Sequence, residues 1–349
     1  SFFRDEFGIN NLDLKTEKNE VKNLVKLLRL NKDTPQLYLI DKAINKGKIS
    51  LEANVNFDEE GKIQDDFKVS GKITDLYLSL LNKSEIKDLN FNFNFLNKNI
   101  DLKNLSLNYL NLKILSENIL LKKKNKLYFI EGDIKNSSQL IPNKIISLVL
   151  KNNYFDKIIL STKNDFSFKI NKNFKISDFN VKSKINIDEA TLGLEKKSIK
   201  KYVPGFANEL KFINHDLDIE YKKKILVKGS GKIGIGNKED KIEYNLNYIN
   251  DQLEYDAVLF LNETSIKLDL INFSKKENIK SKLQIKGKNT DKKIKIEKIS
   301  LSTDNSNIDL YNFEITKNYR VTNFEKIKLK YFDNENKKND LLIKNSNKN

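Results

Sequence analysis

The feature that most constrains the fold is a strict two-residue alternation of apolar and polar side chains. It is clearest over residues 49–57, 89–95 and 242–248, and it recurs along most of the chain. Successive side chains of a β-strand point to opposite faces, so this alternation predicts strands with one apolar and one polar face. We therefore expect a mainly β protein, built as a meander of long strands joined by short polar turns.

Composition favours a thin sheet over a thick core. Of 349 residues, 38% are hydrophobic and 32% are charged. That balance is too apolar and too regular for a disordered chain, yet less apolar than is usual for a compact globule. A sheet with few positions buried on both sides satisfies both observations.

Missing residue types exclude several classes of chemistry. The chain has no Cys, which excludes disulfides, thiolate metal sites and a cysteine nucleophile. It also has no Met, even at its first position, so we interpret it as a segment of a longer parent chain whose N-terminal signal or anchor is missing. No apolar run approaches the roughly 20 residues that a membrane-spanning helix requires.

The net charge is +16, and almost all of its cations are lysines. Arg4, Arg29 and Arg320 are the three arginines. Base recognition relies on the planar guanidinium group, so we expect no specific nucleic-acid partner. Solvated strand faces in a Lys-, Asn- and Ile-rich chain account for the charge, and attraction to an anionic membrane surface stays open as an alternative.

The alternation of apolar and polar residues is interrupted at a few places, and these interruptions predict how the chain is divided into segments. The order is an N-terminal helical segment at 1–46, a first β-sheet module at 47–138, a helical break at 139–154, a second β-sheet module at 155–333 and a disordered tail at 334–349. The apolar phase shifts at Thr74–Asp75, which predicts a β-bulge or a bend. The second module includes a predicted strand near 264–272.

A search for catalytic groups gives little. His215 is the only histidine, so a triad or a histidine metal site is possible only around this one residue, and we predict a structural or solvent-exposed role for it. Gly229, Gly231 and Gly234 spell GxGxxG, but strand alternation continues through them, whereas a dinucleotide site needs a following helix. The carboxylates are scattered. We predict no enzyme activity, no catalytic residue, no metal and no cofactor.

Three architectures satisfy a long one-sided meander. They are a sandwich of two sheets, a transmembrane barrel and an elongated, curved sheet whose apolar face lines an open groove. A barrel should carry aromatic girdles at its strand ends, whereas this chain scatters its 21 Phe and 13 Tyr along the strands. The apolar face has no matching second sheet, so we favour an open, β-taco-like apolar groove with a few short helices.

The first part of the chain resembles the AsmA-like family, in particular its large YhdP- and TamB-related members. The resemblance lies in the succession of a strand, a turn glycine and a further strand over Gly47–Leu51, Val55–Ile63, Phe67–Asp75 and Ile86–Phe93. A second strand pair, which ends at Ile130–Ile134, is similar as well. The helix expected ahead of Gly47 is also similar. Over the rest of the chain, only the strand pattern agrees.

The resemblance implies a repeating β-groove similar to the bridge-like lipid-transfer proteins. Such proteins stand in the periplasm of Gram-negative bacteria, tethered to the inner membrane, and conduct phospholipid between the inner and outer membranes. The implied partners are phospholipid or another acyl lipid, both membrane surfaces and the remainder of the parent chain. The predicted groove-lining residues are Val55, Phe57, Phe67, Val69, Phe91, Phe93, Phe95, Leu105, Leu107, Tyr109, Phe166, Phe168, Ile185, Ile187, Tyr244, Leu246, Ile266, Leu268, Leu270, Ile308 and Leu310.

Two other functions fit the same alternation. A structural or adhesive β-protein would close its apolar faces into a dry core and hold no ligand. An outer-membrane β-barrel would turn them toward lipid.

Overall fold

The computed structural model describes residues 10–345, apart from 32, 59, 65, 81–83, 150–154, 174, 195–196, 291–292 and 317–319. The helical segments are α1 (Val21–Asn31), α2 (Pro35–Ala43), α3 (Asn143–Val149), α4 (Lys197–Lys200) and the 3₁₀ turn η1 (Asp269–Ile271). The first strands are β1 (Asn11–Glu20), β2 (Ile44–Asn56), β3 (Lys68–Ser79), β4 (Glu85–Leu96), β5 (Asn99–Tyr109), β6 (Leu112–Lys124) and β7 (Leu127–Leu140). They are followed by β8 (Phe155–Asn171), β9 (Ile176–Gly193), β10 (Glu209–Tyr221), β11 (Ile225–Ile235), β12 (Lys238–Ile249) and β13 (Gln252–Phe260). The last are β14 (Ile266–Leu268), β15 (Phe273–Lys275), β16 (Ser281–Asn289), β17 (Lys293–Thr303), β18 (Asn307–Thr316), β19 (Val321–Asn323), β20 (Lys326–Phe332) and β21 (Lys338–Lys344).

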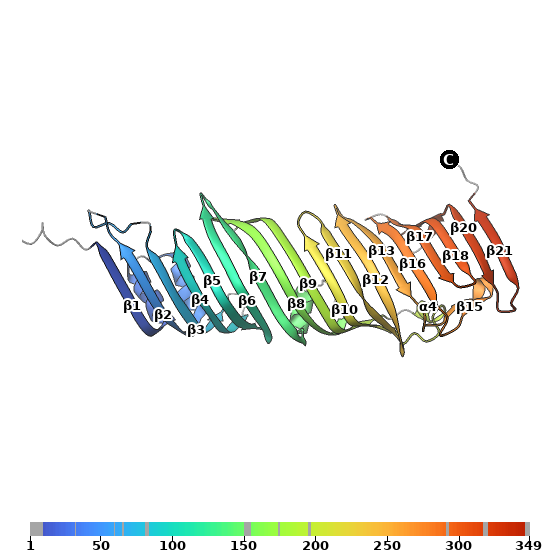
Figure 1. Cartoon of the computed structure of the whole chain (residues 1–349), viewed down its shortest axis with the longest axis horizontal. Coiled ribbons are helices and arrows are strands. Elements are labelled where there is room, and N and C mark those ends of the chain that lie inside the picture. Colours follow the sequence, from blue (N-terminus) through green and yellow to red (C-terminus); the bar gives the residue numbers. More distant parts are fainter. Residues whose placement is uncertain are drawn as a thin grey trace, which may run out of the picture. The chain divides into compact units, whose positions relative to one another are not determined.

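The strands form an antiparallel meander of 19 strands, and β14 and β15 pair separately (Figure 1). β1 to β7 pair in chain order, as do β10 to β13. β13 then pairs with β16, and pairing continues through β17 and β18 to β20 and β21. The end strands pair with β2 and β20 respectively, so the meander is open. The predicted mainly β antiparallel meander is confirmed.

The chain divides into two compact units. Unit 1 comprises Ser1–Ser137 and Thr162–Val181, and unit 2 comprises Ser138–Ser161 and Lys182–Asn349. β8 and β9 each contribute one part to either unit. The predicted modules, 47–138 and 155–333, were separated at the helical break, and α3 lies inside that stretch.

Two terminal predictions of secondary structure are wrong. Residues 11–20 were expected in the helical segment at 1–46 but form β1, which pairs with β2. Residues 338–344 were expected in the disordered tail but form β21, which pairs with β20. Both are edge strands with weak alternation of their own, so pairing with a strongly patterned neighbour decides their structure.

A third correction concerns the predicted strand at 264–272. The chain there leaves the sheet as β14, η1 and β15, and β13 pairs directly with β16. Ile266 and Phe273 of this short hairpin are buried in the core of unit 2. The hairpin therefore covers the sheet and does not extend it.

The predicted bulge at Thr74–Asp75 is confirmed and belongs to a line of bulges across unit 1. Asp75 of β3, Asp88 of β4 and Asn104 of β5 all have positive φ angles, of 53°, 52° and 53°. Register shifts lie at these positions in the β3–β4 and β4–β5 pairs. Short polar residues tolerate this left-handed conformation best. Each bulge changes which parity of residue faces the apolar side.

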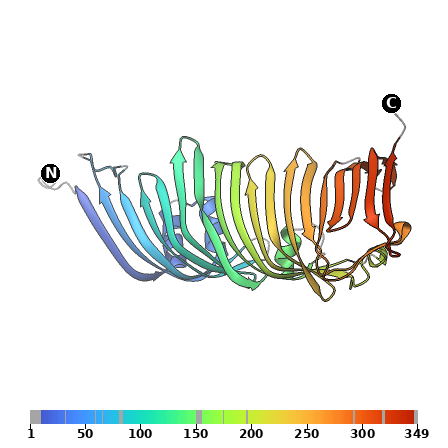
Figure 2. The same cartoon turned by 45° about the vertical axis from the view of Figure 1, so that its right-hand side comes forward.

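α1 packs on part of the apolar face of unit 1, and Figure 2 shows the helices of this unit beside its strands. Val21 and Val25 of α1 are buried against Ile49, Leu76 and Leu89 of the sheet. α2 begins at Pro35, and the Leu37 amide donates to the Thr34 hydroxyl oxygen at 3.2 Å, as a helix N-cap should.

Candidate functional site

A continuous apolar row crosses the sheet of unit 1, away from the helices. Strand pairing aligns one residue from each of β1 to β7 on the same face. The unit 1 open row consists of Leu14, Ala53, Val69, Phe95, Ile100, Leu121 and Ile130. Neighbouring strands lie about 4.8 Å apart, so six spacings give a row about 29 Å long.

This row is accessible to solvent. Leu14 at the sheet edge is 48% exposed, and the other six residues are half-buried among their neighbours in the sheet. The buried cluster that α1 closes is made of other residues, from Ile44, Ile49, Leu76 and Leu89 on the sheet side. The row is therefore an apolar surface on a sheet face of which only part is covered.

The adjacent row contains glycines that lie beneath aromatic rings. Gly71 of β3 pairs with Phe93 of β4, and a Cβ atom placed on Gly71 would come within 2.7 Å of the Phe93 ring. In unit 2, a Cβ on Gly287 would come within 2.7 Å of the Tyr255 hydroxyl. An aromatic ring laid across a strand glycine is a recurring way of covering it. The rings thus lie low over the sheet and keep the apolar surface shallow.

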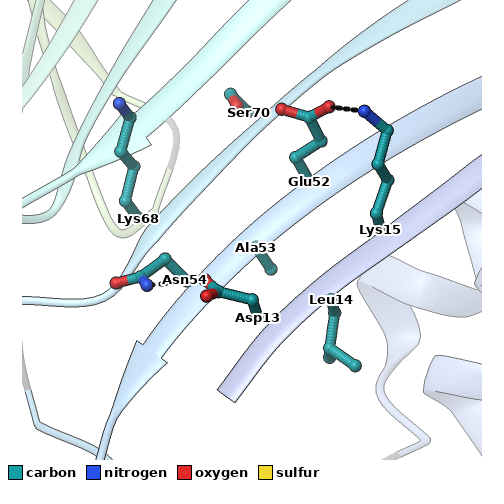
Figure 3. A pocket seen from close by; sticks show the side chains of 8 residues that line it. All are labelled: Asp13, Leu14, Lys15, Glu52, Ala53, Asn54, Lys68 and Ser70. Atoms are coloured by element: carbon teal, nitrogen blue, oxygen red, sulfur yellow. Dashed lines mark hydrogen bonds and ion pairs between the residues drawn. The ribbon is translucent and has the colours of Figure 1, made fainter. Parts of the chain in front are cut away.

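The opposite face of the same strands is polar. Lys15 and Glu52 form an ion pair at 2.7 Å across β1 and β2, and the Asn54 side chain donates to Asp13 at 2.7 Å. Figure 3 shows these groups around a shallow hollow of about 380 Å³, with Leu14 directed away from the ion pair. On β1 and β2 the two faces therefore differ in chemistry, as the alternation predicted.

Unit 2 repeats the arrangement on a separate set of strands. Its open row crosses β10 to β13 and β16 to β18. The unit 2 open row consists of Ile219, Val227, Leu246, Tyr255, Gly287, Ile296 and Phe313. All except Gly287 are half-buried.

A second row on the same face of unit 2 is closed. The unit 2 covered row consists of Gly231, Ile242, Leu259, Leu283, Leu301, Ile308 and Leu329. Phe206, Ile266 and Phe273 are buried in the same cluster as Ile308. Tyr331 fixes the covering hairpin by donating its hydroxyl hydrogen to the Ile271 carbonyl at 2.9 Å. This row is an ordinary dry core.

His215 is fully buried at a bulge of β10, next to the covered row. Its Nε2 atom and the Tyr244 hydroxyl are hydrogen-bonded at 3.0 Å, and the two rings stack with centroids 5.5 Å apart. A Cβ on Gly231 would come within 2.5 Å of His215 Nδ1, and a Cβ on Gly229 within 2.6 Å of the Tyr244 ring. Burial lowers the pKa of His215 below 6.5. The three GxGxxG glycines lie in β11, and Gly229 and Gly231 make room for these rings, which agrees with the rejection of the motif as a nucleotide site.

Lys275 is a buried charge that the sequence did not reveal. Its ammonium group donates to the carbonyl oxygens of Leu261, Asn262 at 2.8 Å and Thr264 at 2.7 Å. Buried Asp240 accepts from the Thr264 amide at 3.0 Å. Burial lowers the pKa of Lys275. With every ammonium hydrogen directed at a carbonyl, this lysine anchors the loop between β13 and β14.

The predicted lining residues fall into three groups. Ile266 and Ile308 are buried in the core of unit 2, and Leu270 is 99% exposed on η1. The third group is half-buried: Val55, Phe57, Phe67, Val69, Phe91, Phe93, Phe95, Leu105, Leu107, Tyr109, Phe166, Phe168, Ile185, Ile187, Tyr244, Leu246, Leu268 and Leu310. Within it, Phe91, Phe93, Leu105 and Leu107 pack on the α1 cluster, and Tyr244, Leu268 and Leu310 pack on the unit 2 core.

The open rows contain residues that the predicted set missed. Ile100 of the unit 1 open row pairs with Phe95 and Leu121, and Leu102, which pairs with Phe93, lies in the adjacent row. The predicted set took the odd parity on β5, from Leu105 onward, but the bulge at Asn104 changes parity within the strand. The positive-φ preference of Asn at a phase change was the available signal.

The described residues contain no group of three or more His, Asp or Glu side chains able to hold a metal ion. No protein-family model, curated protein or solved structure matches the chain.

Proposed function

We propose that the open rows bind acyl chains of phospholipid. The observation that carries the proposal is the unit 1 open row, a continuous apolar surface across seven strands with no helix of the buried α1 cluster over it. Its length of about 29 Å exceeds the depth of one bilayer leaflet, about 15 Å of hydrocarbon. An acyl chain laid along the row stays in contact with apolar side chains over its whole length.

Binding requires no chemical step. Burial of one methylene contributes about 0.8 kcal/mol, so ten methylenes contribute about 8 kcal/mol before ordering costs. Each of the seven strands crossed by the unit 1 open row contributes an apolar side chain, so an acyl chain can shift along the row in small steps. The lipid headgroup stays in water.

We further propose the wider role that the AsmA-like resemblance implies, conduction of phospholipid between the inner and outer membranes in a Gram-negative periplasm. Among the described residues, no helix is long and apolar enough to cross a membrane.

Adjacent leucines on β6 give a matched test. Leu121 lies in the open row, whereas Leu120 lies on the opposite face, paired with Asp101 and Glu131. Both are half-buried. The protein is purified, its bound lipid is extracted, and the phospholipid is quantified by mass spectrometry. Leu121→Lys should lose most of the bound lipid because it places a charge in the acyl path, and Leu120→Lys should retain it.

Equal lipid content in both variants contradicts the proposal, as does a wild-type protein that contains no lipid. The competing function is a structural β-protein with a dry core, which the closed core of unit 2 favours. It predicts no bound lipid in any variant.

A further inference from the structure

The helix pair of unit 1 has a second apolar surface that faces away from the sheet. On α1, Leu27 and Leu30 are 62% and 85% exposed. On α2, Tyr38, Leu39 and Ile40 are all close to half exposed. With Leu28, which is 47% exposed, six large apolar side chains are exposed on these two short adjacent helices, which is unusually many for such a small element.

The charged side chains of this helix pair determine which partners its apolar surface can bind. The carboxylates of Asp33 and Asp41 both bind the Arg29 guanidinium, at 2.9 and 2.6 Å. Lys26 and Lys42 are exposed, and no ion pair to either is found among the described residues. The two acids of the segment 21–43 are therefore engaged by Arg29. The ammonium group of Lys42 lies 5.6 Å from the centre of the Tyr38 ring, beside the exposed apolar side chains.

The geometry points to an anionic phospholipid surface as the partner of this helix pair. Exposed leucine, isoleucine and tyrosine side chains beside lysines are typical of helices that lie in the membrane interface. Apolar side chains enter the acyl boundary, the Tyr38 ring suits the headgroup level, and lysines meet lipid phosphates. A protein partner of the same surface would need acidic groups opposite Lys26 and Lys42. This docking role goes beyond acyl binding and does not require the open rows to hold lipid.

The Arg29 contacts hold the surface together. The guanidinium lies 5.1 Å from the centre of the Tyr38 ring and binds Asp41 of α2. It thereby joins α1 to α2 and lies against the exposed Tyr38 ring. The surface is thus preformed on the folded unit, and docking needs no refolding.

Vesicle co-sedimentation tests the proposal. The whole protein is mixed with phosphatidylcholine vesicles that contain or lack phosphatidylglycerol. We expect binding to the anionic vesicles, weakened at high salt. The double variant Leu30→Asp/Ile40→Asp should bind about tenfold more weakly because both side chains leave the apolar phase. Leu96→Asp is the matched control, since Leu96 is exposed on β4 outside the helix pair, and it should bind as wild type does.

Several outcomes overturn the proposal. They are absence of wild-type binding to anionic vesicles, equal binding by the double variant, and equal loss by Leu96→Asp. Light scattering that shows a dimer, dissociated by the double variant, assigns the surface to a second copy and also overturns it. The Leu121→Lys variant distinguishes acyl binding in the open row from docking of the helix pair. It should lose bound lipid and still bind anionic vesicles. Circular dichroism confirms that each variant is folded.

Discussion

The covered and open rows of unit 2 lie on one face of the same strands, yet one is a core and the other a surface. Ile308 of β18 and Ile296 of β17 come from equally regular alternation. Ile308 is buried beneath a cluster that includes Ile266 and Phe273, whereas Ile296 is half-buried, between Gly287 and Phe313. Alternation therefore specifies which face is apolar. Segments that leave the sheet decide which part of that face becomes a core.

The largest expected effect is the difference in stability loss between alanine variants of these two isoleucines. Ile308→Ala should lower the free energy of unfolding by about 3 kcal/mol, because it leaves a cavity in a closed core. Ile296→Ala should cost about 1 kcal/mol, since the removed atoms are only partly shielded from water. Urea unfolding followed by circular dichroism measures both. Equal losses would mean that the open row is as closed as the covered one.

The second prediction concerns the glycines beneath aromatic rings. Gly71→Ala in unit 1 should cost about 2 kcal/mol, because the new Cβ meets the Phe93 ring and the Ser50 carbonyl oxygen. The control is Gly205→Ala, where a Cβ meets nothing within 4 Å, and it should change stability by less than about 0.5 kcal/mol. The same urea measurement applies. A neutral Gly71→Ala would show that the ring is free to lift and that the open face is less regular than described.

The smallest effect comes from His215, on the covered side of the comparison. Its pKa is lowered by burial, whereas the unfolded chain takes up a proton near 6.5. Stability is therefore complete above about pH 6.5 and falls at lower pH, as the unfolded state binds more protons. Urea midpoints from pH 7.5 to pH 5.5 should fall for the wild type and stay nearly level for His215→Gln. Parallel profiles would place His215 in contact with water.

Much of the sheet was predictable because alternation reports strand faces directly. The bulge at Asp75 was predictable from the phase change at Thr74, and the strand character of Gly229 and Gly231 from the alternation around them. The apolar rows follow once register is known, but register depends on bulges such as Asn104, whose effect on parity is seen only in the pairing.

The covering segments were not predictable from local pattern. The hairpin containing Ile266 and Phe273 has the same residue types as a sheet strand, so its departure from the sheet depends on contacts distant in sequence. The Lys275 anchor gives no signal, because nothing separates a buried lysine from the others in a lysine-rich chain. Edge strand β1 carries charges throughout and is fixed by its partner.

The most direct test of the account maps where an acyl chain lies. A phospholipid that carries a photoreactive diazirine in its acyl chain is bound to the wild-type protein and cross-linked, and the modified residues are identified by mass spectrometry. The account predicts adducts on the open rows, at Phe95, Leu121 and Leu246, and none at Leu120 or Ile308. Adducts spread equally over Leu120 and Leu121, or concentrated on the polar face, would contradict it.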